Sequence, residues 1–65
     1  MRIDRKKLSC CMVNKDMKVI DLAAATGLSR ITISNIKNGK SCTHETANKI
    51  AAALDVDINK LLLNE

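Results

Sequence analysis

Aromatic side chains are absent from this chain of 65 residues, which contains no phenylalanine, tyrosine or tryptophan. A hydrophobic core must therefore be built from leucine, isoleucine, valine, alanine and methionine. The same absence removes the platforms on which many proteins stack the bases of single-stranded nucleic acids. Binding of single strands by base stacking is thus disfavoured.

The residues that usually carry catalysis are also scarce. The chain has one histidine and two glycines, with no glycine-rich phosphate loop and no pair of carboxylates in an apolar setting. A chain of this length leaves no volume for a substrate pocket. We therefore expect that it is not an enzyme and that it uses no cofactor and no small-molecule ligand.

Cysteine is present in an odd number, as Cys10, Cys11 and Cys42. Without a secretory context this favours free thiols over a disulfide framework. Cys10 and Cys11 are neighbours on a predicted helix and point about 100° apart, so they do not readily join Cys42 and His44 in one tetrahedral zinc site. We expect no metal, with Cys11 in the core, Cys10 partly exposed and Cys42 in a loop; a redox switch at Cys42 is the weaker alternative.

Long apolar runs are missing as well. No run approaches the ~20 residues that span a membrane, and no apolar segment follows Met1 and Arg2 as it would in a signal peptide. Hydrophobic residues make up 46% of the chain, which is typical of a globular protein rather than a disordered one. We expect one cytoplasmic domain over residues 1–65, with no membrane partner.

Positive charge is concentrated in the N-terminal two-thirds of the chain, whose net charge is +4. Residues 1–18 hold six basic and two acidic side chains, and residues 26–44 hold three basic side chains and no acidic one. Such a field suits a polyanion such as nucleic acid. Charge alone leaves open the alternative of a basic, solvated surface.

Apolar spacing and capping residues predict five short helices and no strand, hence an all-α fold. The first four helices are expected over about 5–14, 19–25, 30–37 and 44–54, and a short fifth helix follows Asp57. The expected N-caps are Asp4, Ser29, Thr43 and Asp57. Lys18 is a weak cap for the second helix.

Three- and four-residue spacing also predicts the buried faces. The helix over 44–54 has one stripe, formed by Ala47, Ile50, Ala51 and Leu54. The inner positions of the helix over 5–14 are Leu8, Cys11 and Met12. For the helix over 19–25 they are Ile20 and Ala23 with either Ala24 or Leu22.

The segment 22–40 is the most informative part of the sequence. It is predicted to contain the end of one helix, a tight turn at Gly27, and a second helix that buries Ile33 and Ile36. The outward side chains of this second helix can form hydrogen bonds: Arg30, Thr32, Ser34, Asn35 and Lys37. A short helix packed steeply on another, with such side chains outward, is the helix-turn-helix arrangement that reads a DNA major groove.

A family resemblance rests on a small residue, a glycine four positions later, and branched apolar residues six and nine positions after that: Ala23, Gly27, Ile33 and Ile36. Together with Ser29-Arg30, Asn38-Gly39-Lys40 and the segment 45–56, they resemble the Cro/C1-type helix-turn-helix regulators over about residues 4–63. The resemblance implies a five-helix, lambda-repressor-like domain with the motif over about 19–38. It also implies a dimer that regulates promoters.

The resemblance further implies that the helix over 30–37 lies in the major groove and contacts bases through Arg30, Ile31, Thr32, Ser34 and Asn35. Arg30 can bind guanine O6 and N7 or a phosphate, Asn35 can pair with adenine N6 and N7, and Ile31 can contact a thymine methyl group. The alternatives are a merely solvated Arg30 and an Ile31 that serves packing.

Members of this family commonly hold phosphates with the start of the second helix and with the loop after the third. The candidate phosphate contacts, which offer charge, hydroxyl groups or exposed amides, are Lys18, Val19, Ser29, Lys37, Asn38, Lys40, Ser41 and Thr43. Val19 departs from the pattern, because many members have glutamine there. Its backbone N–H, or the charge of Lys18, would have to replace the glutamine contact.

Three successive leucines at 61–63 cannot all be buried in one small core. We expect a self-associating patch with Leu61 and Leu63 as interface candidates, and with Leu63 facing outward. A homodimer would read two half-sites about one helical turn apart. The predicted function is a sequence-specific regulator, in its simplest form a repressor, that binds palindromic double-stranded DNA.

A protein-interaction module, such as an antitoxin-like partner, is the alternative, because the fold alone does not prove the function. Val19 and the leucine-rich end favour a protein partner. The basic balance of residues 26–44 and the polar face of the helix over 30–37 favour DNA.

Overall fold

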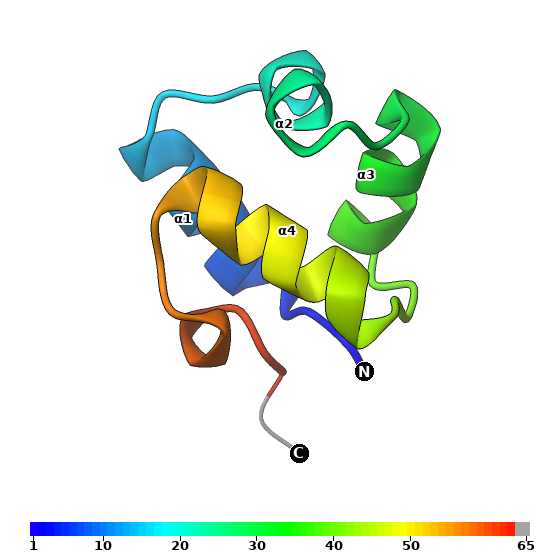
Figure 1. Cartoon of the computed structure of the whole chain (residues 1–65). Helices are drawn as coiled ribbons and strands as arrows, with labels where there is room; N and C mark the ends of the chain where they lie inside the picture. Colours follow the sequence, from blue (N-terminus) through cyan, green and yellow to red (C-terminus); the bar gives the residue numbers. More distant parts are fainter. Residues whose placement is uncertain (64–65) are drawn as a thin grey trace.

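The computed structural model describes residues 1–63, and this part of the chain forms four α-helices and one turn of 3₁₀ helix (Figure 1). The elements are α1 (Arg5–Asn14), α2 (Val19–Thr26), α3 (Arg30–Lys37), α4 (His44–Leu54) and η1 (Ile58–Lys60). One isolated antiparallel bridge joins Ile3 to Leu62, and residues 1–63 contain no β-strand. The all-α class is confirmed, and the predicted fifth helix is a single 3₁₀ turn.

The helices begin where their capping side chains predict. The four expected caps each accept a backbone N–H from the first turn that follows: Asp4, Ser29, Thr43 and Asp57. At the start of α2 the chain uses a different device, in which the backbone N–H of Lys18 donates to the carboxylate of Asp21 at 2.9 Å. This half of a capping box satisfies the backbone N–H of Lys18, while the Lys18 side chain makes no capping hydrogen bond to the first turn.

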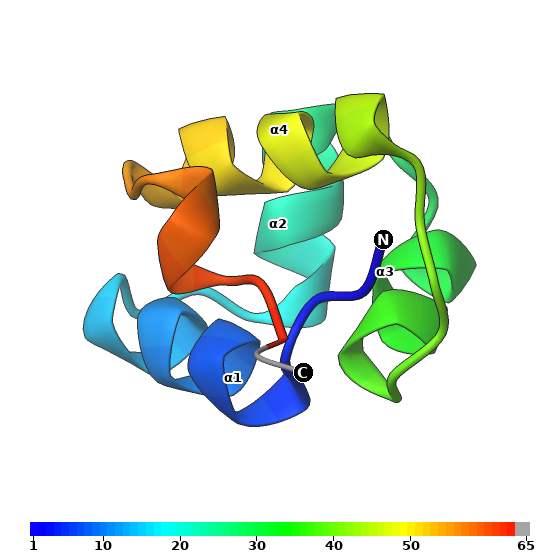
Figure 2. The ribbon, with the colours of Figure 1, turned by 90° about the horizontal axis from the view of Figure 1, so that it is seen from below.

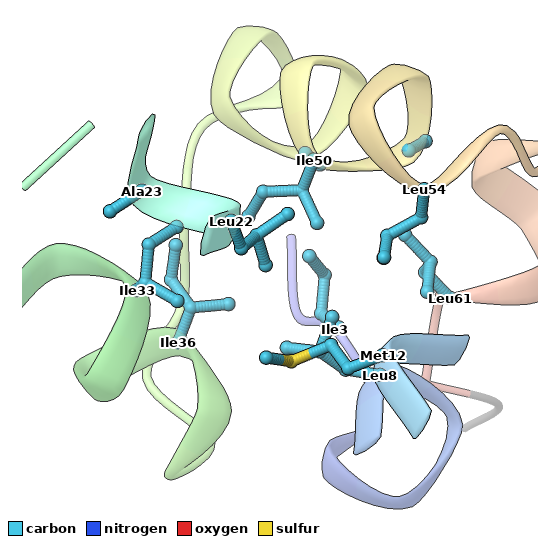
Figure 3. Packing of buried hydrophobic residues seen from close by; sticks show 12 residues of the cluster. Ile3, Leu8, Met12, Leu22, Ala23, Ile33, Ile36, Ile50, Leu54 and Leu61 are labelled. Atoms are coloured by element: carbon cyan, nitrogen blue, oxygen red, sulfur yellow. The ribbon is translucent and has the colours of Figure 1, made fainter. Parts of the chain in front are cut away.

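The core lies where α4 meets the other helices, and Figure 3 shows the side chains that converge there. The buried hydrophobic residues are Ile3, Leu8, Met12, Leu22, Ala23, Ile33, Ile36, Ala47, Ile50, Ala51, Leu54 and Leu61. The predicted α4 stripe and the inner face of α3 are thus confirmed. Within residues 1–63 no helix is long and apolar enough to cross a membrane.

The inward face of α2 differs from part of the prediction. Leu22 and Ala23 are buried, whereas Ile20 is 56% exposed and Ala24 is exposed. Two helical positions are about 200° apart around the axis, so Ile20 points away once Leu22 faces the core. Since α2 packs against both α3 and α4, its buried face consists of two adjacent residues, Leu22 and Ala23, which together cover both neighbouring helices. The expectation for Ile20 was wrong, and of the two alternatives Ala24 and Leu22 it is Leu22 that faces the core.

The first four residues connect two parts of the molecule that are distant in sequence (Figure 2). On one side the N–H of Asp4 donates to the carbonyl of Leu61 at 2.7 Å. On the other side the N–H of Cys42 donates to the carbonyl of Met1 at 2.9 Å, and the amino group of Met1 donates to the carbonyl of Cys42 at 3.3 Å. The N-terminal segment therefore lies between the loop after α3 and residues 61–63, a pairing that the sequence did not predict.

Gly27 ends α2 in the predicted left-handed conformation, with a φ of +75°. Its N–H donates to the carbonyl of Ala23 at 2.9 Å, which closes the last turn of the helix. A Cβ atom added to Gly27 would meet no atom within 4 Å. The need for glycine is therefore conformational rather than steric, because side chains disfavour this region of φ.

Replacing Gly27 by alanine is expected to lower the free energy of unfolding by ~1–2 kcal/mol through backbone strain. Gly27→Asn is the matched comparison and is expected to lose less, because asparagine tolerates the left-handed region. Urea denaturation followed by circular dichroism measures both values. Equal losses in the two variants would contradict a conformational cause.

Candidate nucleic-acid interface

Helix α3 is held against the domain by its inner face. Ile33 is 0% and Ile36 is 3% exposed, and both pack in the cluster that contains Ala23 of α2. At the start of α3 the hydroxyl of Ser29 accepts the N–H of Thr32 at 3.0 Å and donates to the Thr32 hydroxyl at 2.9 Å. The inner contacts and the cap together fix which residues of α3 face outward.

The most exposed residues of α3 are Arg30 and Ile31. Arg30 is exposed, and Ile31 is 74% exposed although it is strongly apolar. The other predicted base contacts, Thr32, Ser34 and Asn35, are half-buried. The expectation of an outward polar face therefore holds fully at Arg30 and partly at these three positions. The exposure of Ile31 rules out the alternative in which it serves as a packing residue.

The loop after α3 presents the expected hydrogen-bonding groups. Asn38, Lys40, Ser41 and Thr43 are exposed, and Lys37 at the end of α3 is half-buried. The hydroxyl of Thr43 accepts the N–H of Thr46 and donates to the Thr46 hydroxyl. Ser29 and Thr43 thus use their hydroxyl groups to cap helices, and their phosphate contacts stay predictions.

The start of α2 offers one cation and one backbone amide. Lys18 is exposed, and Val19 is half-buried with its side chain packed against the core. As the first residue of α2, Val19 has a backbone N–H that no carbonyl within the helix can accept. Asp21, whose carboxylate lies at the same helix start, was not among the predicted residues. An acidic residue three positions after an N-cap is the sequence signal of a capping box, and this spacing could have predicted the role of Asp21.

The candidate cations are not used in ion pairs within residues 1–63. The two pairs found there are Lys15 with Asp55 at 3.8 Å and Lys49 with Glu45 at 3.7 Å. Neither pair contains Lys18, Arg30, Lys37 or Lys40, the cations predicted to meet DNA. Their charges are therefore available to an external anion.

The three cysteines are free thiols with different surroundings. Cys10 is exposed, whereas Cys11 and Cys42 are half-buried, so the core position predicted for Cys11 is only partly right. Residues 1–63 contain no cluster of three or more potential metal ligands. Burial raises the pKa of the Cys42 thiol, and the positive N-terminal amino group acts in the opposite direction.

The two interface candidates at the leucine-rich end are placed differently. Leu61 is 0% exposed and packs in the core, where η1 turns it toward α4. A side chain buried in this way within one chain cannot contact a second copy, so Leu61 was wrongly predicted as an interface residue. Leu63 is 40% exposed and faces outward as predicted.

The family comparison agrees with this geometry. Residues 7–62 match the family described as the Cro/C1-type HTH DNA-binding domain. The chain therefore belongs to this helix-turn-helix family, and DNA binding is the property that defines the family. No curated protein sequence gives a significant match.

Solved structures with the same fold are parts of a much larger protein. The chain is 25% identical to a point mutant of hydroxyethylphosphonate dioxygenase and superimposes on it with a TM-score of 0.86. Native PhpD with cadmium and PhpD with cadmium and hydroxyethylphosphonate give TM-scores of 0.84 and 0.83, also at 25% identity. In each case the match covers 98% of this chain and 14% of the other.

The surroundings of Cys42 predict slow modification and a pH effect. At pH 8 iodoacetamide is expected to alkylate Cys42 more slowly than Cys10, because the Cys42 thiol is half-buried and its pKa is raised. Mass spectrometry of intact and digested protein measures both rates. Faster reaction at Cys42 would contradict the placement.

A raised pKa in the folded state means that folding favours the protonated thiol. The contribution of Cys42 to stability is therefore complete below the ordinary cysteine pKa of 9.0 and is lost as the pH rises through the higher pKa of the folded state. Comparison with Cys42→Ser isolates this effect from other groups that titrate at high pH. The wild type should lose more stability than the variant between pH 8 and pH 10.

Proposed function

We propose that this chain is a transcriptional regulator that inserts α3 into the major groove of double-stranded operator DNA and represses by occupying the promoter. The observation that carries the proposal is the exposure of Arg30 and Ile31 on a helix whose inner residues, Ile33 and Ile36, are buried. An exposed apolar side chain beside an exposed guanidinium suits a groove that offers both thymine methyl groups and guanine acceptors.

In this proposal Arg30, Ile31, Thr32, Ser34 and Asn35 contact bases. The Thr32 hydroxyl accepts from Ser29, so its own hydrogen can be donated to a base acceptor. Two flanking regions hold the backbone of the DNA, namely the start of α2 and the loop after α3. Phosphate contacts set the position of the helix, while base contacts select the sequence.

A second copy of the chain completes the operator-binding unit in the proposal. Leu63 is 40% and Met1 is 43% exposed, and both line a shallow hollow with Arg2 and the half-buried Leu62. This apolar patch is the candidate for self-association. A two-fold dimer reads a palindrome with half-sites about one helical turn apart.

The proposed role involves binding alone, with no reaction, cofactor or small-molecule ligand. The dioxygenase and PhpD chains bear on the fold, because this chain spans 14% of their length. An activity named for those whole proteins is therefore not carried over. Sequence-specific binding to DNA is the property to test.

The first experiment selects bound duplexes from a fragment library of the source genome with purified protein at ~150 mM salt, where non-specific binding is weak. Enrichment of a palindrome with half-sites near one helical turn apart is expected. Absence of enrichment by a folded protein, together with a stoichiometric protein partner in pull-downs, would instead support the protein-interaction alternative.

Substitutions in the two classes of contact should behave differently on the selected operator. Arg30→Ala or Asn35→Ala is expected to cost ~1–3 kcal/mol and to relax preference at one base position in each half-site. Lys40→Gln should weaken binding to all sequences alike and flatten the salt dependence by ~0.9 per chain. Fluorescence anisotropy with labelled duplexes measures affinity, and unchanged base preference in Arg30→Ala would refute its role.

A further inference from the structure

A basic surface that extends beyond the DNA-binding motif lies where the start of α1 meets the end of α3. Its residues are Arg2, Arg5, Lys6, Lys37, Asn38 and Gly39, and they are called the α1–α3 surface below. Two hollows shape it. One, of about 390 Å³, is lined by Arg2, Arg5, Lys6, Asn38 and Gly39 together with Ile3, Asp4 and Leu63, so that it borders the patch proposed for self-association. The other, of about 410 Å³, is lined by Arg5, Lys6, Ser9, Lys37 and Asn38.

The two hollows form one continuous surface, because Arg5, Lys6 and Asn38 line both. The stem of Arg5 lies along the turn after α3, with its Cδ 3.7 Å from the position that a Cβ on Gly39 would occupy. Arg5 is exposed and lines both hollows together with Asn38, a residue already predicted to meet a phosphate.

The neighbouring acid reduces the positive charge of this surface but does not cancel it. Asp4 is the one acidic residue that lines the first hollow, against Arg2, Arg5 and Lys6, and its carboxylate accepts the backbone N–H groups of Lys6 at 2.8 Å and Lys7 at 3.4 Å as the cap of α1. Neither ion pair found within residues 1–63 involves Arg2, Arg5 or Lys6. A concave, cationic surface of this kind fits phosphate groups.

We propose that the α1–α3 surface binds the sugar-phosphate backbone of the operator, with Arg5 and Lys6 each contacting a phosphate beyond those held by the loop after α3. The inference rests on the proposed function, because this surface lies at the C-terminal end of α3. It can meet a DNA strand there only if α3 enters the major groove. It adds to the interface two residues from an element outside the helix-turn-helix motif.

A purely structural role for the same cations makes a different prediction. Positive charge near the C-terminal end of α3 complements the helix dipole, and its loss would lower stability without changing the number of phosphates contacted. The salt dependence of DNA binding separates the two roles, because its slope counts the counterions that bound phosphates release.

The test compares Arg5→Gln/Lys6→Gln with a control of equal charge, Lys15→Gln/Lys49→Gln. The control removes two cations that lie at the far end of α1 and on α4, where they pair with Asp55 and Glu45. Glutamine keeps most of the side-chain stem in every case. Thermal unfolding of all proteins shows whether each variant is folded before binding to the selected operator is measured from 0.05 to 1 M salt.

The test variant is expected to lower the slope of log K against log salt by ~1.8 for each chain bound. Its affinity per chain should fall by about 30-fold at 0.15 M salt and converge with the wild type near 1 M salt. The control should keep the wild-type slope. Ethylation interference should lose one or two phosphate positions in each half-site in the test variant alone.

The outcomes distinguish the two proposals. If the wild type binds its operator and the test variant keeps both slope and footprint, the α1–α3 surface does not bind DNA and only this inference is overturned. If both double variants lose slope equally, the effect is one of net charge and the inference is again overturned. If the folded wild type selects no operator, the proposed function fails and this inference fails with it.

Discussion

The packing of α3 onto α2 is the interaction on which the DNA-binding face depends. Ile33 and Ile36 are buried against the part of α2 that contains Ala23, and the small alanine side chain allows the two helices to approach closely. Burial of these two isoleucines determines that Ile31, about 200° from Ile33 around the helix axis, points outward, and the exposed Arg30 lies beside it in the first turn. The left-handed Gly27 fixes the turn that brings the two helices into this contact.

The core achieves this without a single aromatic ring. Branched aliphatic side chains from every helix meet in one cluster, and Ile3 and Leu61 from the two ends of the chain contribute to it. A domain of this size buries a smaller fraction of its surface than a large domain does, so each large side chain carries a large share of its stability. The fit of Ile3 and Leu61 explains why the ends of the described chain are fixed rather than loose.

Local signals in the sequence predicted the helices and the motif well. The caps at Asp4, Ser29 and Thr43 and the stripe along α4 depend on neighbouring residues, and all of them are found in the structure. The errors concern relations between distant segments. Leu61 is buried because η1 turns it toward α4, and Ile20 is exposed because α2 must serve two neighbours at once. In the sequence, the basic residues of α1 indicated only a positive net charge. Their position next to the end of α3 became clear from the fold, which places Arg5 beside Gly39.

The pairing of Met1 with Cys42 has a consequence for anything attached before the first residue. Two hydrogen bonds of opposite direction hold Met1 on the loop that follows α3. A segment fused upstream would therefore start at the edge of the recognition surface, not at a remote end of the domain. Its charge would act at short range on the same anion, so an acidic fusion would repel DNA and a basic one would attract it.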